Sequence, residues 1–206
     1  MSYCDYWNNA SDINKEYHDS EWGVPVYDDK VQFEYLMLEV LQCGLSWNTV
    51  INKRKIFRKC FDKFDYDLIA KYSSDDIERI MNTEGMIKSS RKIEAIINNA
   101  RCFQKIREEF GSFSNYLWKY TDNKTILYNN HELGYIPACN GLSDIISKDL
   151  KKRGFKFLGS VTVYSHLQAC GVINDHGKEC PRYKFINSNY KTVKMPNFSE
   201  KNVITP

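Results

Sequence analysis

Two cysteines and two histidines, placed near the two ends of the chain, are candidate ligands for a metal ion. Cys4 and His18 lie at the start, while His176 and Cys180 lie 158 residues further on, at a His-x3-Cys spacing. Two thiolates and two imidazoles suit a tetrahedral structural zinc site, which would tie an N-terminal arm to the end of the last predicted helix. The alternative is that the histidines are ordinary polar residues and the cysteines are buried apolar ones.

A single carboxylate, Glu39, interrupts the apolar run Leu36–Leu41. Because an unpaired carboxylate is costly to bury, its surroundings decide its role. Helical spacing places it on a polar stripe that either faces water or lines a pocket. In a pocket, the carboxylate would accept hydrogen bonds from the amine edge of a flat, cationic heterocycle. The other members of the stripe are Gln32, Tyr35, Gln42 and Ser46.

Aromatic residues occur in the sequence on both sides of this helix and could form the walls of such a pocket. Rings stack on the faces of flat heterocycles, although aromatic residues more often simply fill a core. Both interpretations stay open at this point. The candidate rings are Tyr17, Trp22 and Trp47, with Tyr6 and Trp7 as further choices.

Residues 142–171 have the pattern of two helices joined by a short turn. Ser143 can cap the first helix, and Gly154 supplies the left-handed residue that ends it. The second helix begins at Gly159 and Ser160. Such a pair is either a simple αα-hairpin or a phosphate-binding element, because backbone amides at the start of the second helix attract anions. Nearby cations favour phosphate binding, and these are Lys151, Lys152, Arg153 and Lys156.

Helical periodicity dominates the rest of the chain and predicts an all-α fold. Asp28 or Asp29 can start a helix that ends near Gly44, and an amphipathic helix covers residues 88–109. Shorter helices are predicted near 48–60, 66–71, 74–82 and 112–120. The stretch 121–141 is predicted to be a connector, and 183–206 a loosely ordered tail. Residues 1–182 therefore form the predicted folded unit.

The composition excludes several classes of protein. Of the 206 residues, 42% are hydrophobic, which suits one globular unit or two small lobes that share a core. The net charge of +3 gives no strong overall field, so a basic patch has to be local. The sequence has no apolar leader and no run long enough to span a membrane, and its seven cysteines are scattered. We therefore expect a reducing, cytoplasmic compartment.

Several short motifs, taken together and in order, are more specific than any single residue. They resemble those of the 3-methyladenine DNA glycosylase I family, and the resemblance covers residues 1–182. The motifs are Cys4, Glu16-Tyr17-His18-Asp19, Glu21-Trp22-Gly23-Val24-Pro25, Leu38-Glu39, Gly44-Leu45-Ser46-Trp47, the stretch from Lys151 to Gly159, and Asn174-Asp175-His176.

The resemblance implies a two-lobed helix-hairpin-helix fold in which a structural zinc ion joins the two ends of the chain. It also implies hydrolysis of the N-glycosidic bond of N3-methyladenine by base flipping, with N3-methylguanine as a minor substrate, an abasic site as product and no lyase step. The implied partner is double-stranded DNA with alkylated bases, bound by a monomer. The implied location is the nucleoid, or the nucleus of a eukaryote.

The resemblance also implies roles for individual residues. Glu39 and Tyr17 would contact the flipped base, and Trp47 would stack on it. Trp22 and Tyr6 would shape the pocket. Leu45 would enter the gap left by the flipped nucleotide. Phosphates would be held by Lys151, Lys152, Arg153, Gly154, Lys156 and Gly159.

Two positions depart from the pattern that the resemblance implies. Asn14 stands about one turn before His18, where we expect an aromatic residue. Asn174 stands where many helix-hairpin-helix glycosylases have an aspartate, so Asp175 is either an offset substitute or a residue that ends a helix. Two other functions stay open: a zinc-stabilised binder of damaged DNA without catalysis, and a zinc-containing enzyme that acts on a cationic aromatic metabolite.

Overall fold

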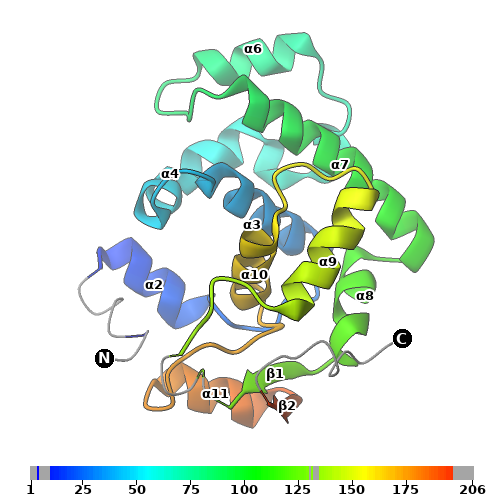
Figure 1. Ribbon diagram of the computed structural model, residues 1–206. Helices are drawn as coiled ribbons and strands as arrows, with labels where there is room; N and C mark the ends of the chain where they lie inside the picture. The colour runs from blue at the N-terminus through cyan, green and yellow to red at the C-terminus, as the bar shows by residue number, and fades with distance from the viewer. Residues whose placement is uncertain (1–3, 5–9, 130, 132–134, 197–206) are drawn as a thin grey trace.

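The computed structural model describes residues 4, 10–129, 131 and 135–196, and most of them are helical (Figure 1). In chain order the elements are α2 Asp12–Ser20, α3 Asp29–Gln42, α4 Trp47–Cys60, η1 Asp62–Phe64, α5 Tyr66–Ile69, α6 Ser74–Asn82, α7 Ser90–Phe110, α8 Phe113–Trp118, η2 Lys119–Thr121, β1 Thr125–Tyr128, α9 Gly141–Lys152, α10 Ser160–Ala169, α11 Pro181–Asn189 and β2 Thr192–Met195.

Helix α3 lies in the middle of the fold, packed against α4, α7, α8 and α10. Its side chains are buried without a break from Gln32 to Leu41, which explains the long apolar run in the sequence. The helix begins as predicted, because the side chain of Asp28 accepts a hydrogen bond from the Val31 amide at 2.9 Å. At its end, the ammonium of Lys92 donates to the carbonyls of Leu41 and Cys43 at 2.6 and 2.7 Å. Lys92 thus supplies partners for carbonyls that a helix end leaves unpaired.

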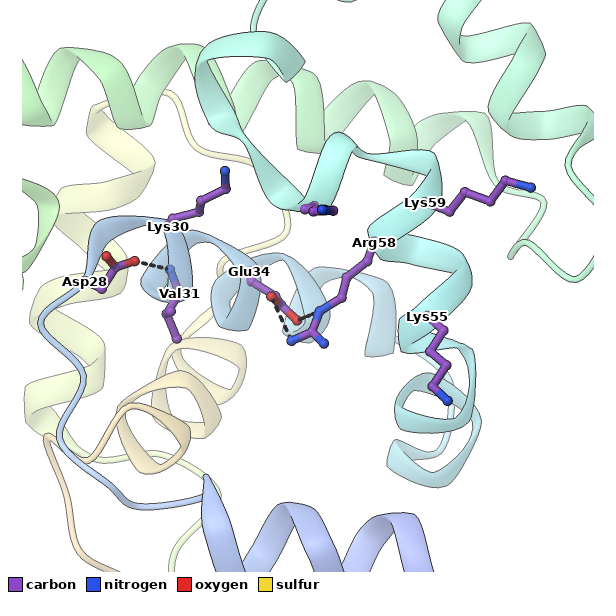
Figure 2. A pocket seen from close by; sticks show the side chains of 8 residues that line it. Asp28, Lys30, Val31, Glu34, Lys55, Arg58 and Lys59 are labelled. Atoms are coloured by element: carbon purple, nitrogen blue, oxygen red, sulfur yellow. Dashed lines mark hydrogen bonds and ion pairs between the residues drawn. The ribbon is translucent and has the colours of Figure 1, made fainter.

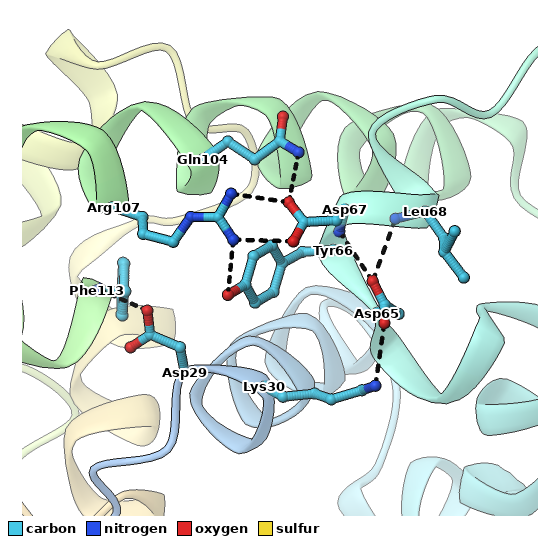
Figure 3. Close-up of polar contacts among 9 residues, drawn as sticks. All are labelled: Asp29, Lys30, Asp65, Tyr66, Asp67, Leu68, Gln104, Arg107 and Phe113. Atoms are coloured by element: carbon cyan, nitrogen blue, oxygen red, sulfur yellow. Dashed lines mark hydrogen bonds and ion pairs between the residues drawn. The ribbon is translucent and has the colours of Figure 1, made fainter. Parts of the chain in front are cut away.

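Helices α4 to α7 form the upper part of the view in Figure 1, and α5 packs against α7. The guanidinium of Arg107 on α7 holds the carboxylate of Asp67 through two contacts of 2.8 and 3.0 Å, and Gln104 donates to the same group (Figure 3). Lys30 of α3 reaches Asp65 at 3.1 Å. These contacts connect the short α5 to both longer helices.

Helices α9 and α10 pack against each other as the predicted pair of helices with a short turn. Gly154 has φ of 91°, a left-handed conformation, and it ends α9 as expected. One detail of the prediction is wrong: α9 is capped by Asn140, and Ser143 is its reciprocal partner in a capping box. The hydroxyl of Ser147 donates to the carbonyl of Leu158 at 2.7 Å, which holds the turn against α9.

The all-α prediction needs a correction, because two short strands pair in parallel. Residues Thr125 to Tyr128 of β1 lie opposite Thr192 to Met195 of β2, and Ile126 also bridges to Ile173. Strand β1 lies inside the predicted connector. Strand β2 and most of α11 lie in the predicted tail, which is therefore folded as far as residue 196. Ile186 of α11 is fully buried and anchors this segment to the rest of the protein.

One main hydrophobic cluster extends from Tyr17 to Ile173 and includes side chains from the N-terminal, central and C-terminal parts of the chain. These parts therefore share a core. Among the described helices, none combines the length and apolar character needed to cross a bilayer.

Candidate active site and metal centre

The carboxyl group of Glu39 is buried in the middle of the protein without a charged partner. Its side chain is on α3 and the residue is only 5% exposed. Within the part of the chain that the structure describes, its carboxyl group makes no hydrogen bond or ion pair, and burial alone raises its pKa to about 8. The interpretation of the polar stripe as a water-facing surface is therefore wrong. A buried polar group without a partner is costly, so this arrangement indicates a binding site for a ligand.

Tyr17 lies near this carboxyl group, and its ring packs against that of Trp47. The two rings have centroids 5.0 Å apart, and the indole Nε1 of Trp47 is buried without an acceptor among the described residues. Burial raises the pKa of the Tyr17 hydroxyl, and the nearby charges of Tyr35 and Glu39 add to the effect. Tyr17 thus lies near both Glu39 and Trp47. The predicted roles of Glu39, Tyr17 and Trp47 in contacting a base stay predictions.

A chain of ion pairs holds the wall behind Tyr17. Arg54 of α4 contacts Glu34 at 2.6 Å and Glu21 at 2.8 Å, and Tyr35 donates to Glu21 at 2.9 Å. The ring of Tyr35 meets that of Tyr17 edge-on at 6.4 Å. Sequence reasoning missed this network, although the spacing of four residues between Arg54 and Arg58 places both on one face of α4.

Arg58 completes the network at the border of a basic pocket. Its guanidinium contacts Glu34 at 2.9 and 3.2 Å, and Figure 2 shows this pair next to the hollow. The pocket has a volume of about 660 Å³. Glu34 and Glu39 are five residues apart on α3, so they point to different sides of the helix. The pocket is lined by Asp28, Lys30, Val31, Glu34, Lys55, Arg58, Lys59 and Lys63.

The four residues predicted as metal ligands come together. Their ligand atoms all lie within 4.8 Å of one another. Sγ of Cys4 lies 3.7 Å from Nδ1 of His176, and Sγ of Cys180 lies 3.6 Å from the same nitrogen and 3.8 Å from Nε2 of His18. Two ligands on a tetrahedral zinc ion would be about 3.4–3.8 Å apart, given usual zinc–sulfur and zinc–nitrogen bonds. The donor set and its spacing therefore fit a tetrahedral metal ion.

Neighbouring groups orient both imidazoles toward the centre of this cluster. Nδ1 of His18 contacts Asp19 at 2.7 Å, and Nε2 of His176 contacts the carbonyl of Trp22 at 3.0 Å, so each ring keeps its other nitrogen for a metal. The amide of Gly177 donates to Sγ of Cys4. At Gly23, a Cβ atom would lie 2.8 Å from Nε2 of His176, which explains the glycine after Trp22.

The structure places Trp22 beside the metal cluster. Its ring stacks on that of His18 at 5.9 Å and meets that of His176 edge-on at 4.6 Å. The predicted role of Trp22 in shaping the base pocket stays a prediction. The other predicted wall, Tyr6, lies outside the described residues, as does Trp7.

The residues predicted to contact DNA divide into two groups. Leu45 is 39% exposed on the α3–α4 loop, and the side chains of Lys151, Lys152 and Lys156 point to solvent. Near them, Gly159 precedes α10 with open space around it, and no side chain caps this helix start. Arg153, by contrast, contacts Glu109 at 2.6 Å and Asp149 at 2.8 Å. It stabilises the end of α9, and Gly154 serves the turn through its backbone conformation.

Asp175 forms part of a buried polar network. Its carboxylate contacts His131 at 2.6 Å, Tyr164 at 2.7 Å and Gln168 at 2.8 Å. Its hydrogen-bonding capacity is thus used to hold α10 against the segment that follows β1. The structure favours a packing role over the offset catalytic role. Asn14, the other departure, is buried and donates to Asn48 at 2.7 Å, which connects α2 to the start of α4.

Comparison with known proteins identifies the family of the chain. The sequence profile of the methyladenine glycosylase family matches residues 7–183. DNA-3-methyladenine glycosylase 1 of Escherichia coli (strain K12) is 41% identical over 177 residues, covering 86% of this chain and 95% of the relative. DNA-3-methyladenine glycosylase of Haemophilus influenzae is 38% identical over 175 residues, covering 85% and 95%.

A solved structure leads to the same conclusion. The crystal structure of a tyrosine-to-phenylalanine variant of 3-methyladenine DNA glycosylase I, in complex with 3-methyladenine, has a TM-score of 0.81 and 37% sequence identity. The match covers 88% of this chain and 97% of that one. With a buried acceptor, two adjoining rings and a Cys/His cluster in place, the chain belongs to the methyladenine glycosylase family.

Proposed function

We propose that this protein hydrolyses the N-glycosidic bond of N3-methyladenine in double-stranded DNA and leaves an abasic site. The observation that carries the proposal is the buried carboxyl group of Glu39, which has no partner among the described residues and lies near Tyr17. The relatives named above support it, since their names state an activity on 3-methyladenine. N3-methylguanine, whose base is also positively charged, is the proposed minor substrate.

The chemistry of the substrate explains how such a site would act. An adenine alkylated at N3 is positively charged in DNA, so its bond to the sugar is weakened and it leaves as a neutral base. The enzyme therefore needs to extrude and recognise the base more than to protonate it. A damaged base pairs poorly, which lowers the cost of flipping it into a buried pocket. Recognition by a carboxylate and stacked rings favours the cation over normal adenine.

Each pocket residue has a specific part in this proposal. The carboxylate of Glu39 accepts hydrogen bonds from the amine edge of the base, and its negative charge faces the positive ring. Trp47 stacks on the face of the base, and Tyr17 closes the other side of the slot. A positive base favours the ionised form of Glu39, so binding near neutral pH releases a proton from this side chain.

The DNA duplex would be held by groups outside the pocket. Leu45 enters the stack where the base leaves it, and the hairpin lysines with the free start of α10 bind phosphates. Lyase chemistry would require an amine that attacks the sugar. Lys92, next to this loop, instead uses its ammonium to bind two backbone carbonyls. We also propose that the enzyme is monofunctional and acts as a monomer.

We also propose that the metal held by Cys4, His18, His176 and Cys180 is zinc. Two cysteines and two histidines form a closed set of four ligands, which is typical of structural rather than catalytic zinc. The cluster joins α2 to the segment before α11, and the ring of Trp22 lies against it. Its part in the reaction would be to fix α2, which carries Tyr17, relative to the C-terminal segment.

The test is release of free base from methylated DNA, measured by chromatography. The wild-type protein should release 3-methyladenine, and Glu39→Gln should release it much more slowly while remaining folded. Glu84→Gln, a change at an exposed carboxylate between α6 and α7, is the matched control and should behave like the wild type. Tight DNA binding by the wild type without any free base would instead assign the protein to non-catalytic binders of damaged DNA.

A further inference from the structure

Three exposed apolar side chains lie where the α3–α4 loop meets the α9–α10 turn. Leu45 is 39% exposed, Phe157 36% and Val161 55%. The thiol of Cys43, two residues before Leu45, lies 3.9 Å from the carbonyl oxygen of Phe157 and 3.8 Å from the hydroxyl of Thr162. The loop and the turn are therefore in contact, and the apolar side chains belong to one part of the surface.

A groove of about 310 Å³ lies beside this surface, between α7 and the turn. Two cations border it, Arg91 on α7 and Lys156 on the turn, and neither forms an ion pair within the described residues. Ala95 and the ring of Phe157 add apolar surface. The groove thus combines unpaired positive charge with an exposed ring. Its lining residues are Arg91, Glu94, Ala95, Asn98, Lys156 and Phe157.

The backbone at Phe157 is held in a conformation that side chains rarely adopt. Its φ of 60° lies in the left-handed region, where residues other than glycine are strained. Two asparagines of α7 impose this shape: Asn99 pairs with both backbone groups of Lys156 at 2.8 and 3.0 Å, and Asn98 donates to the carbonyl of Gly154 at 2.8 Å. A strained residue that exposes a large ring indicates a functional role for the ring.

We propose that this groove binds the DNA strand beside the flipped nucleotide. A backbone phosphate lies between Arg91 and Lys156, and Phe157 packs against the neighbouring base as a second apolar wedge next to Leu45. Alternating cations and exposed apolar side chains are the chemistry with which proteins grip and unstack nucleic acid. The proposal rests on the proposed function, since it takes DNA as the partner.

The experiment measures binding to a duplex with a stable abasic-site analogue over a range of salt concentrations. Arg91→Ala should lower the slope of log K against log salt by about one, the contribution of one phosphate contact. Phe157→Gly should weaken binding roughly tenfold at each salt concentration, because a base–aromatic contact is lost. Glycine fits the left-handed backbone, so this variant should not unfold at a lower temperature.

Two further variants and one further ligand complete the design. Phe157→Asn tolerates a positive φ and replaces the glycine variant if that one fails to fold. Lys59→Ala, an exposed cation at the other pocket, is the control and should leave the slope unchanged. Free 3-methyladenine should bind all variants like the wild type, because the base pocket is untouched.

The proposal on the groove is overturned if Arg91→Ala and Phe157→Gly bind the duplex like the wild type. It is also overturned if the variants lose DNA binding only because they unfold, since the role of Phe157 would then be limited to packing within the protein. If the variants weaken DNA binding while the wild type releases no base, the groove stands and the proposed glycosylase function fails. The two conclusions are therefore tested separately.

Discussion

Replacing Glu39 by glutamine should make the protein more stable and less active at the same time. Burial raises the pKa of Glu39 from an ordinary 4.5 to about 8. Between these two values the native state keeps a proton that the unfolded state has released. The stability of the wild type therefore falls by about 1.4 kcal/mol for each pH unit in this window and changes no further above it. Over the whole window the loss is roughly 5 kcal/mol.

Glutamine has nearly the same shape but carries no titrating proton. The difference in unfolding free energy, variant minus wild type, should thus be near zero below pH 4.5 and rise to several kcal/mol in favour of the variant near pH 8. Release of 3-methyladenine should fall roughly 10- to 150-fold, because a charge-assisted hydrogen bond is worth about 1.5–3 kcal/mol.

Urea unfolding at a series of pH values measures this difference, because other groups titrate in both proteins and cancel. Glu84→Gln, at an exposed carboxylate, should give a difference that stays flat with pH. If the Glu39→Gln difference is also flat, or if the wild type is the more stable protein near pH 8, then Glu39 is ionised in a well-solvated or paired site. The reasoning that assigns it to base recognition would then be refuted.

Four other outcomes follow from the site. An N3,N9-dialkylated adenine is a permanent cation, so its affinity should rise up to tenfold per pH unit as the pH approaches the pKa of Glu39. Isothermal calorimetry at a series of pH values measures this affinity. Chelation or Cys180→Ser should remove one equivalent of metal and lower the melting temperature. The metal site would be contradicted if the purified protein held less than half an equivalent of metal and chelation left its melting temperature unchanged. Asp175→Asn should lower stability by about 1–3 kcal/mol yet keep single-turnover release, whereas selective loss of release would restore its catalytic role. Lys92→Met should lower stability by about 1–3 kcal/mol, measured by urea unfolding, because carbonyls at the end of α3 lose their partner.

The predictable parts of the fold are those that local chemistry specifies. Helix α3 could be delimited because Asp28 caps it and its apolar run is uninterrupted except at Glu39. The four metal ligands could be proposed because two cysteines and two histidines lie near the two ends of the chain, with His176 and Cys180 at a His-x3-Cys spacing. That they meet in space follows from the packing of α2 against the C-terminal segment, which spacing alone does not determine.

The parts that sequence reasoning missed depend on contacts between distant segments. Strand β1 is a run of four buried residues, too short to show alternation, and its partner β2 comes from a polar stretch far along the chain. Arg153 looked like a phosphate ligand because it follows two lysines. Its ion pair with Glu109 lies across 44 residues and appears only after folding.

The difference between Glu34 and Glu39 carries the functional argument. Both carboxyl groups are buried on α3, 7% and 5% exposed. Glu34 is neutralised by Arg54 and Arg58, so its charge is fully used in fixing α4 against α3. Glu39 has no such partner in the described part of the chain, and the protein is less stable for burying it. Folding alone gives no reason to keep a destabilising acid there, whereas under the proposed function a cationic base beside Trp47 would supply the missing charge. Glu34 thus has two counter-ions, whereas Glu39 has none among the described residues. A buried acid without a counter-ion is what a site for a positively charged ligand requires.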